Sequence, residues 1–69
     1  MKTEFTVRGE YIELIKLLKA VGAAPTGGAA KIMVDQEIVS VNGVPETRKR
    51  RKIRAGDTVT CGEITISIQ

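Results

Sequence analysis

Six positive charges fall within seven consecutive residues, in the run Arg48-Lys49-Arg50-Arg51-Lys52-Ile53-Arg54. No acidic residue interrupts this basic run, although Glu46 precedes it and Asp57 follows it. Crowding like charges on a folded surface costs electrostatic self-repulsion, so a short chain that does so usually has an anionic partner. Arginine is well suited to such a partner, because its planar fork can bind a phosphate group bidentately.

The one apolar member of the basic run decides between a mobile loop and a fixed surface. Charges alone are consistent with a solvated loop that only aids solubility. Ile53, however, comes just before a turn at Gly56-Asp57, which predicts that the run enters a strand and is held by the core. We therefore interpret the basic run as a binding surface on a scaffold.

The length and composition indicate a small folded domain. The 69 residues suffice for one domain spanning 1–69 and leave no room for a second. The apolar content of 42% supports a small core and argues against disorder. The formal net charge is only +3, with scattered acids and concentrated bases. This distribution indicates a local basic patch, unlike the uniformly basic surface of a histone-like chain.

Several function classes lack the residues that they need. With no His and one Cys, neither an intramolecular disulfide nor a zinc site of the usual ligand types is expected. There is no close pair of carboxylates and no nucleophile beside a plausible base, so we expect no enzymatic activity, no cofactor and no small-molecule substrate. Cys61 is interpreted as a small buried strand residue.

The chain is expected to act in the cytoplasm. Met1-Lys2-Thr3-Glu4 lacks the apolar segment of a secretory signal, and no apolar stretch approaches the roughly 20 residues that span a bilayer. A lone cysteine is consistent with a reducing compartment. Because the basic residues do not follow one face of an amphipathic helix, attachment to a membrane surface is not expected.

The first third of the chain predicts a strand and a helix. Residues 3–7 alternate polar and apolar, which indicates a short strand with Phe5 and Val7 inward. Residues 10–21 carry apolar side chains at helical spacing, with acids early and lysines late, as the helix dipole favours. Gly22 is expected to end this helix. Its predicted inward residues are Tyr11, Leu14, Ile15, Leu17, Leu18 and Val21.

A second helix is predicted from Gly27 to about Asp35, with Thr26 as its N-cap. Two glycines in a first helical turn cost about 1 kcal/mol each relative to alanine, so some gain must offset them. Either the turn packs closely against the first helix, or its unpaired N–H groups are left open to a phosphate, and the two explanations are compatible. Lys31, one turn further on, would lean toward the same anion or face solvent.

The second half of the chain predicts strands. Val39 to Val44 contains the hairpin signal Asn42-Gly43, and Pro45 marks the point where the chain leaves the sheet. Two further strands are predicted at 58–61 and 64–69, and the last one is expected to pair with the N-terminal strand. The order β-α-α-β-β-β-β indicates an α+β fold with two packed helices against a small sheet.

These elements, in this order and spacing, resemble the RNA-binding domain first described in ribosomal small-subunit protein S-four, also called the αL motif. The chain is most similar to its small stand-alone bacterial members, the YaaA/YbcJ group. Each motif alone is common, whereas the series is specific. The matching landmarks are Leu17-Leu18-Lys19-Ala20-Val21-Gly22, Gly27-Gly28-Ala29-Ala30-Lys31, Val39-Ser40-Val41-Asn42-Gly43, Glu46-Thr47-Arg48 with its basic followers, and Ala55-Gly56-Asp57.

The resemblance implies an αL RNA-binding fold with a mainly antiparallel sheet, in which RNA lies across the second helix and the strand-edge loop. Glu37 departs from the family pattern, because many members have a Gly there that suits a left-handed turn. It must either adopt a strained backbone or reshape that corner. Carried over to this chain, the RNA-binding surface comprises Gly27, Gly28, Lys31, Asn42, Arg48, Lys49, Arg50, Arg51 and Lys52, with Arg54 included if it faces the same side as Arg51.

The aromatic residues discriminate between kinds of RNA. Phe5 and Tyr11 are the only two, and both are expected to point inward, which leaves no ring for bases to stack on. We therefore predict a structured RNA, such as ribosomal RNA, bound through phosphates and shape on the ribosome or a precursor. The alternative is an interaction module that docks an acidic or ribosomal protein surface. DNA is less favoured, because neither helix carries the polar and basic face that enters a major groove.

Overall fold

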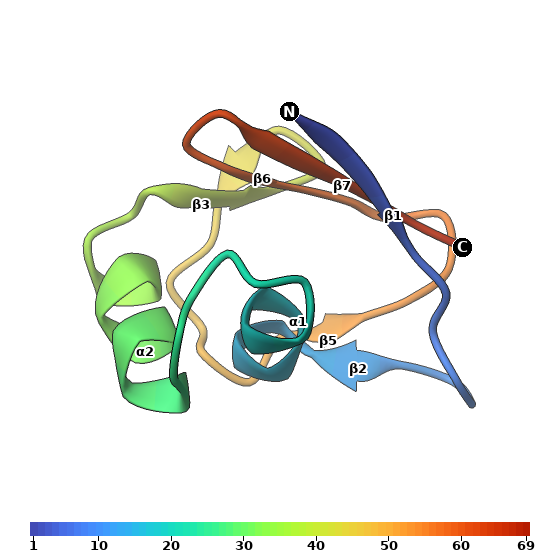
Figure 1. Cartoon of the computed structure of the whole chain (residues 1–69), viewed down its shortest axis with the longest axis horizontal. Helices are drawn as coiled ribbons and strands as arrows, with labels where there is room; N and C mark the ends of the chain where they lie inside the picture. Colours follow the sequence, from blue (N-terminus) through green and yellow to red (C-terminus); the bar gives the residue numbers. More distant parts are fainter.

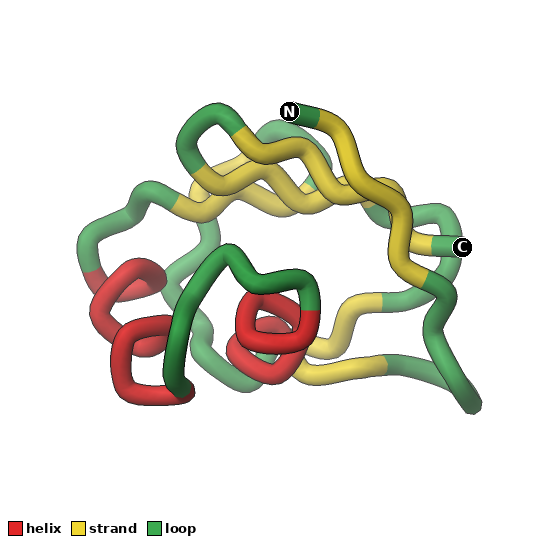
Figure 2. The backbone as a smooth tube through the Cα atoms, in the orientation of Figure 1, coloured by secondary structure: helices red, strands yellow, loops and turns green.

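The computed structural model describes residues 1–69 in two layers, a sheet above and two helices below in the view of Figure 1. The elements in chain order are β1 (Lys2–Phe5), β2 (Ile12–Glu13), α1 (Leu14–Ala20), α2 (Gly27–Asp35), β3 (Val39–Val41), β4 (Val44–Pro45), β5 (Lys52–Ile53), β6 (Thr58–Cys61) and β7 (Ile64–Ile68). Five strands form the sheet in the order β1-β7-β6-β3-β4, and β2 pairs with β5 in a separate ribbon beside α1 (Figure 2).

The sheet is antiparallel except at one edge, where the N-terminal strand β1 pairs with the C-terminal strand β7. β4, β3, β6 and β7 are antiparallel neighbours, whereas β1 lies parallel to β7 with Phe5 opposite Ile68. This arrangement confirms the α+β fold and the expected pairing of the N-terminal and C-terminal strands. β1 ends earlier than predicted, although Val7 still donates its N–H to the Gln69 carbonyl at 2.9 Å.

Two residues with side chains adopt the left-handed backbone. Asn42 has φ +52° and is followed by Gly43 at +85°, which confirms the two-residue hairpin between β3 and β4. Glu37, at the corner between α2 and β3, has φ +59°. The departure from the family pattern is therefore accommodated by backbone strain, which costs a residue with a Cβ about 1–2 kcal/mol.

The hydrophobic core lies between the sheet and the helices. Ile53 is fully buried in it, which confirms that the basic run enters a strand held by the core. Burying one such side chain contributes roughly 1.5–3 kcal/mol. Cys61 is buried in β6 as expected, and burial raises the pKa of its thiol. The helices supply Leu14, Leu17, Leu18, Ala30 and Val34, and the sheet supplies Val39, Val41, Val59, Ile66 and Ile68.

The first helix begins one turn later than its periodicity predicts. α1 starts at Leu14, because Ile12 and Glu13 are extended and pair antiparallel with Lys52–Ile53. The predicted placement of Glu10 and Glu13 in the first helical turn is therefore wrong: that turn contains no acidic residue. The pairing joins two segments that lie about 40 residues apart in the sequence. The local periodicity of residues 10–21 does not reveal such a contact.

Tyr11 lies at the surface, contrary to its predicted place in the core. The residue comes just before β2 and outside α1, so its side chain does not join the buried face of that helix and is 40% exposed. The ammonium of Lys52 lies over its ring, 5.0 Å from the centroid. The expectation that the chain has no exposed aromatic ring is therefore wrong, while Phe5 is partly buried against the core as predicted.

α2 has the predicted bounds and N-cap. The Thr26 hydroxyl accepts a hydrogen bond from the Ala29 N–H at 3.1 Å, which satisfies one of the free donors of the first turn. Ala30 and Val34 are buried and Met33 packs against the core. Neither helix is long and apolar enough to cross a membrane.

Candidate nucleic-acid interface

The basic run connects the two layers of the molecule. After β4 the chain leaves the sheet, descends beside the helices and joins the helix layer as β5 (Figure 1). Two backbone hydrogen bonds fix this crossing: the Leu14 N–H donates to the Arg51 carbonyl at 2.9 Å, and the Ile15 N–H donates to the Lys49 carbonyl at 3.2 Å. The first N–H groups of a helix have no partner within it. The start of α1 therefore holds the basic run through backbone bonds.

Glu46 is the one charged residue that the fold buries, and it organises the basic run from beneath. Its carboxylate accepts three hydrogen bonds from Arg48, from the backbone N–H at 2.9 Å, Nε at 3.0 Å and Nη2 at 3.1 Å. It also accepts from Arg51 Nη1 at 2.6 Å. The bond to the Arg48 side chain is the largest of several causes that lower the pKa of Glu46 to about 2. Its position two residues before Arg48 was the only sequence signal of this role.

Two more carboxylates orient the outer cations. Arg50 Nε lies 2.9 Å from Glu13, whose pKa is lowered mainly by that hydrogen bond, and Lys49 Nζ lies 2.9 Å from Asp35 at the end of α2. Glu13 lies before the helix instead of in its first turn, and it faces the basic run. Exposed pairs of this kind contribute about 0–1 kcal/mol each, so they direct side chains more than they stabilise the fold.

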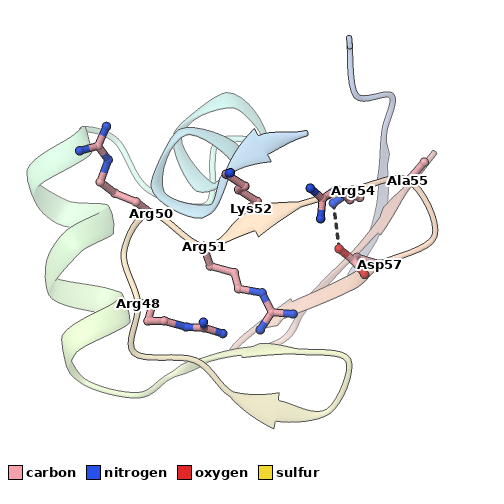
Figure 3. Close-up of a pocket in the computed structure, with 7 residues that line it drawn as sticks. All are labelled: Arg48, Arg50, Arg51, Lys52, Arg54, Ala55 and Asp57. Carbon is pink, nitrogen blue, oxygen red and sulfur yellow. Dashed lines mark hydrogen bonds between the residues drawn. The ribbon is translucent and has the colours of Figure 1, made fainter. Parts of the chain in front are cut away.

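An open hollow of about 650 Å³ lies along the basic run. In Figure 3, Arg48 and Arg51 extend toward one another, whereas Arg50 points away from them. The pairs described above leave the cations accessible, since the side chains of Arg48 and Arg50 are 70% and 82% exposed. Five cations and one carboxylate line the hollow, so it favours an anion. The lining residues are Arg48, Arg50, Arg51, Lys52, Arg54, Ala55 and Asp57.

The structure answers the open question about Arg54 and gives Asn42 an indirect place. Arg54 lines the same hollow as Arg51, and its backbone N–H donates to Asp57 at 2.8 Å, the main cause of the lowered pKa of Asp57. Asn42 does not line the hollow. Its Nδ2 donates to Asp57 at 3.1 Å and its Oδ1 accepts the Thr58 N–H at 2.9 Å. Both ends of its amide are thus engaged in positioning Asp57 and the start of β6.

The start of α2 lies outside the hollow. A Cβ added to Gly27 would meet nothing within 4 Å, and one added to Gly28 would meet only the Thr26 hydroxyl at 3.8 Å. Close packing therefore does not account for these glycines, and that explanation is wrong. Their N–H groups donate to no group of the protein. Lys31 is exposed and forms no ion pair.

Comparisons with known proteins agree with this architecture. The family described as the S4 domain matches residues 5–69. Over 50 residues the chain is 48% identical to the Escherichia coli (strain K12) protein named "Putative RNA-binding protein YbcJ", covering 72% of this chain and 71% of that protein. A Shigella flexneri protein, also called YbcJ, matches to the same extent.

A solved structure extends the likeness to the fold. The solution structure of YbcJ from E. coli, described as revealing an αL motif involved in RNA binding, superposes with a TM-score of 0.73 at 38% identity. It covers 94% of this chain and 84% of the YbcJ chain. The family resemblance and the fold expected from the sequence are both confirmed.

Proposed function

We propose, from the premise that this chain belongs to the S4 domain family, that it binds structured RNA and catalyses no reaction. Ribosomal RNA is the first class to test, on the ribosome or in a precursor. The E. coli relative is described by its αL motif and RNA binding, and the proposal extends that activity to this chain.

The observation that carries the proposal is a set of cations fixed around one hollow before any ligand binds. The Glu46 carboxylate holds the side chains of Arg48 and Arg51. The first N–H groups of α1 hold the backbone carbonyls of Lys49 and Arg51. A surface that is already ordered loses less conformational entropy when it binds. The distribution of positive charge then selects phosphates, and the spacing fixed by the fold selects their arrangement.

The proposed surface extends beyond the hollow to the start of α2. Packing does not explain Gly27 and Gly28, and their free N–H groups are suited to a second phosphate contact, with Lys31 further along α2. Asn42 contributes by positioning Asp57. The direct contacts that we propose are Gly27, Gly28, Lys31, Arg48, Lys49, Arg50, Arg51, Lys52 and Arg54.

The test is the affinity for ribosomal RNA fragments, measured by fluorescence anisotropy across a range of salt concentrations. If about four or five cations meet phosphates, the slope of log K against log salt is roughly −3 to −5, and affinity falls about 10²- to 10³-fold between 50 and 200 mM salt. A DNA duplex of equal charge is the control, because diffuse attraction would bind both polymers alike.

A charge-preserving variant separates guanidinium contacts from diffuse attraction. The double change Arg50→Lys and Arg54→Lys leaves the Arg48 and Arg51 bonds to Glu46 intact while removing two planar forks. Binding several-fold weaker than the parent supports the proposal, since arginine and lysine differ in phosphate geometry. The proposal would be rejected if the parent bound RNA no more tightly than duplex DNA and the variant bound both as tightly as the parent does. If the protein bound an acidic polypeptide but neither RNA nor DNA, the alternative of a module that docks an acidic protein surface would be favoured.

A further inference from the structure

We infer that Tyr11 forms a stacking subsite for an unpaired base of the bound RNA, an inference that rests on the proposed RNA binding and adds a base contact to it. Tyr11 is 40% exposed although the fold places the other aromatic residue, Phe5, against the core. An exposed aromatic face is the surface on which single-stranded bases stack.

The ring of Tyr11 lies where two shallow hollows meet. One, of about 390 Å³, is lined by Tyr11 and Ile12 with the charged residues Glu13, Lys16 and Arg50. The other, of about 520 Å³, is lined by Tyr11 and Ile12 with Phe5 and Arg8 among its neighbours. Arg50 also lines the main hollow of the basic run. The ring is therefore continuous with the proposed phosphate-binding surface.

The charges around the ring suit a nucleotide. The Lys52 ammonium is 5.0 Å from the ring centroid, within the range of a cation–π contact, and can meet the phosphate of a nucleotide whose base lies on the ring. Glu13, the carboxylate that lines the first hollow, is already paired with Arg50 at 2.9 Å and with Lys16 at 3.5 Å. Glu4, the carboxylate that lines the second hollow, accepts a hydrogen bond from the Gln69 side chain.

The occupant is an unpaired base and not part of a duplex. Within a double-stranded stem the base faces are stacked on each other, so single-stranded loops, bulges and overhanging ends are what present a free face. The Lys52 ammonium covers one face of the Tyr11 ring, so the base stacks on the other face. A nucleotide, which joins a flat π-face to a phosphate, matches this pairing of a partly exposed ring with an ammonium. The geometry thus assigns the basic run to the folded part of the RNA and Tyr11 to a neighbouring unpaired nucleotide.

The chain offers a direct readout, because Tyr11 is its only tyrosine and it has no tryptophan. Intrinsic fluorescence therefore reports on this ring alone. Two RNA probes are compared with the full chain: a blunt hairpin whose strands are joined by a non-nucleotide linker, so that it has no unpaired base, and the same hairpin with a short unpaired extension. We expect the extended hairpin to quench the tyrosine emission and the blunt hairpin to leave it nearly unchanged.

Affinity measurements with matched variants complete the test. Tyr11→Leu removes the ring and should weaken binding of the extended hairpin roughly 5- to 140-fold, the equivalent of one base–aromatic stack, without affecting the blunt hairpin. Tyr11→Phe keeps the ring and should bind like the parent. Ile38→Ala changes a residue of similar exposure, 46%, between α2 and β3, and should bind both probes like the parent.

The outcomes separate this inference from the function on which it rests. If the parent binds both hairpins and Tyr11→Leu binds the extended one equally well, the stacking subsite is wrong and RNA binding stands. The same conclusion follows if Tyr11→Phe is as weak as Tyr11→Leu, because the hydroxyl and not the ring would then be responsible. If the parent binds neither hairpin at any salt concentration, the proposed function fails, and the inference fails with it. Circular dichroism of each variant shows that it is folded.

Discussion

The two helices of this small domain differ in how the free N–H groups of their first turns are used. Each starts with N–H groups that no helical carbonyl can accept. At α1, Leu14 and Ile15 donate to carbonyls of the basic run, and the N-cap residue Glu13 makes no capping bond. At α2, Thr26 accepts from Ala29, while the N–H groups of Gly27 and Gly28 have no partner in the protein.

The difference indicates a division of roles. The donors of α1 build the surface, because they fix the backbone of residues 49–51 against the helix layer. The donors of α2 remain open on the outside of the domain, where two residues without side chains flank them. We call the start of α1 the built end and the start of α2 the open end. Mutations at the built end should lower both stability and RNA affinity, whereas mutations at the open end should lower RNA affinity and raise stability.

The largest effect should come from the carboxylate that completes the built end. Glu46→Gln removes the ionic partner of Arg48 and Arg51. We expect a loss of roughly 1.5–3 kcal/mol in the free energy of unfolding, the usual contribution of hydrogen bonds to charged groups, measured by urea denaturation. RNA affinity should also fall, although the net charge becomes more positive. Glu63→Gln, which removes an exposed and unpaired carboxylate, is the matched control. Tighter RNA binding by Glu46→Gln would mean that total charge matters more than the ordered loop.

The same carboxylate gives the domain a pH dependence with a defined sign. Because the folded-state pKa of Glu46 is lowered to about 2, its contribution to stability is complete above the ordinary glutamate pKa and is lost as the pH falls toward 2. Glu13 and Asp57, whose pKa values are also lowered, add to the loss at acidic pH. Urea denaturation from pH 6 to pH 2 should therefore show the stability difference between the parent and Glu46→Gln shrinking with decreasing pH. A constant difference would contradict the role assigned to this carboxylate.

The open end is tested by adding side chains where there is room for them. Gly27→Ala with Gly28→Ala should stabilise the fold by roughly 1–2 kcal/mol, since glycine in a helix costs about 0.5–1 kcal/mol relative to alanine and neither Cβ meets a close contact. RNA affinity should fall about ten-fold, because the methyl groups hinder a phosphate from approaching the N–H donors. Thermal unfolding and anisotropy measure the two effects. A stabilised variant with unchanged affinity would remove the start of α2 from the binding surface.

The far end of α2 should give the smallest effect. Glu37 adopts φ +59°, a conformation that glycine adopts without strain. Glu37→Gly should therefore increase the free energy of unfolding by about 1 kcal/mol, measured by urea denaturation. If stability decreases instead, the strain at this corner is compensated by an interaction of the Glu37 side chain.

The contrast between the two helices also marks what the sequence could predict. The bounds of α2, the hairpin at Asn42-Gly43 and the burial of Ile53 follow from neighbouring residues, and all were predicted. The start of α1 and the exposure of Tyr11 depend on pairing between residues 12–13 and 52–53, which no local periodicity contains. The buried Glu46 was missed for a related reason. Glutamate is rarely buried, and its burial here requires two guanidinium groups that only the folded loop brings around it.

The most direct test of the account is a titration of ¹⁵N-labelled protein with a structured ribosomal RNA fragment, followed through its amide chemical shifts. We expect the largest changes at Gly27, Gly28 and residues 48–54, and none at the turn between β6 and β7. Unperturbed signals from the basic run, together with changes on another face of the domain, would contradict the claim that this ordered set of cations is the RNA-binding surface.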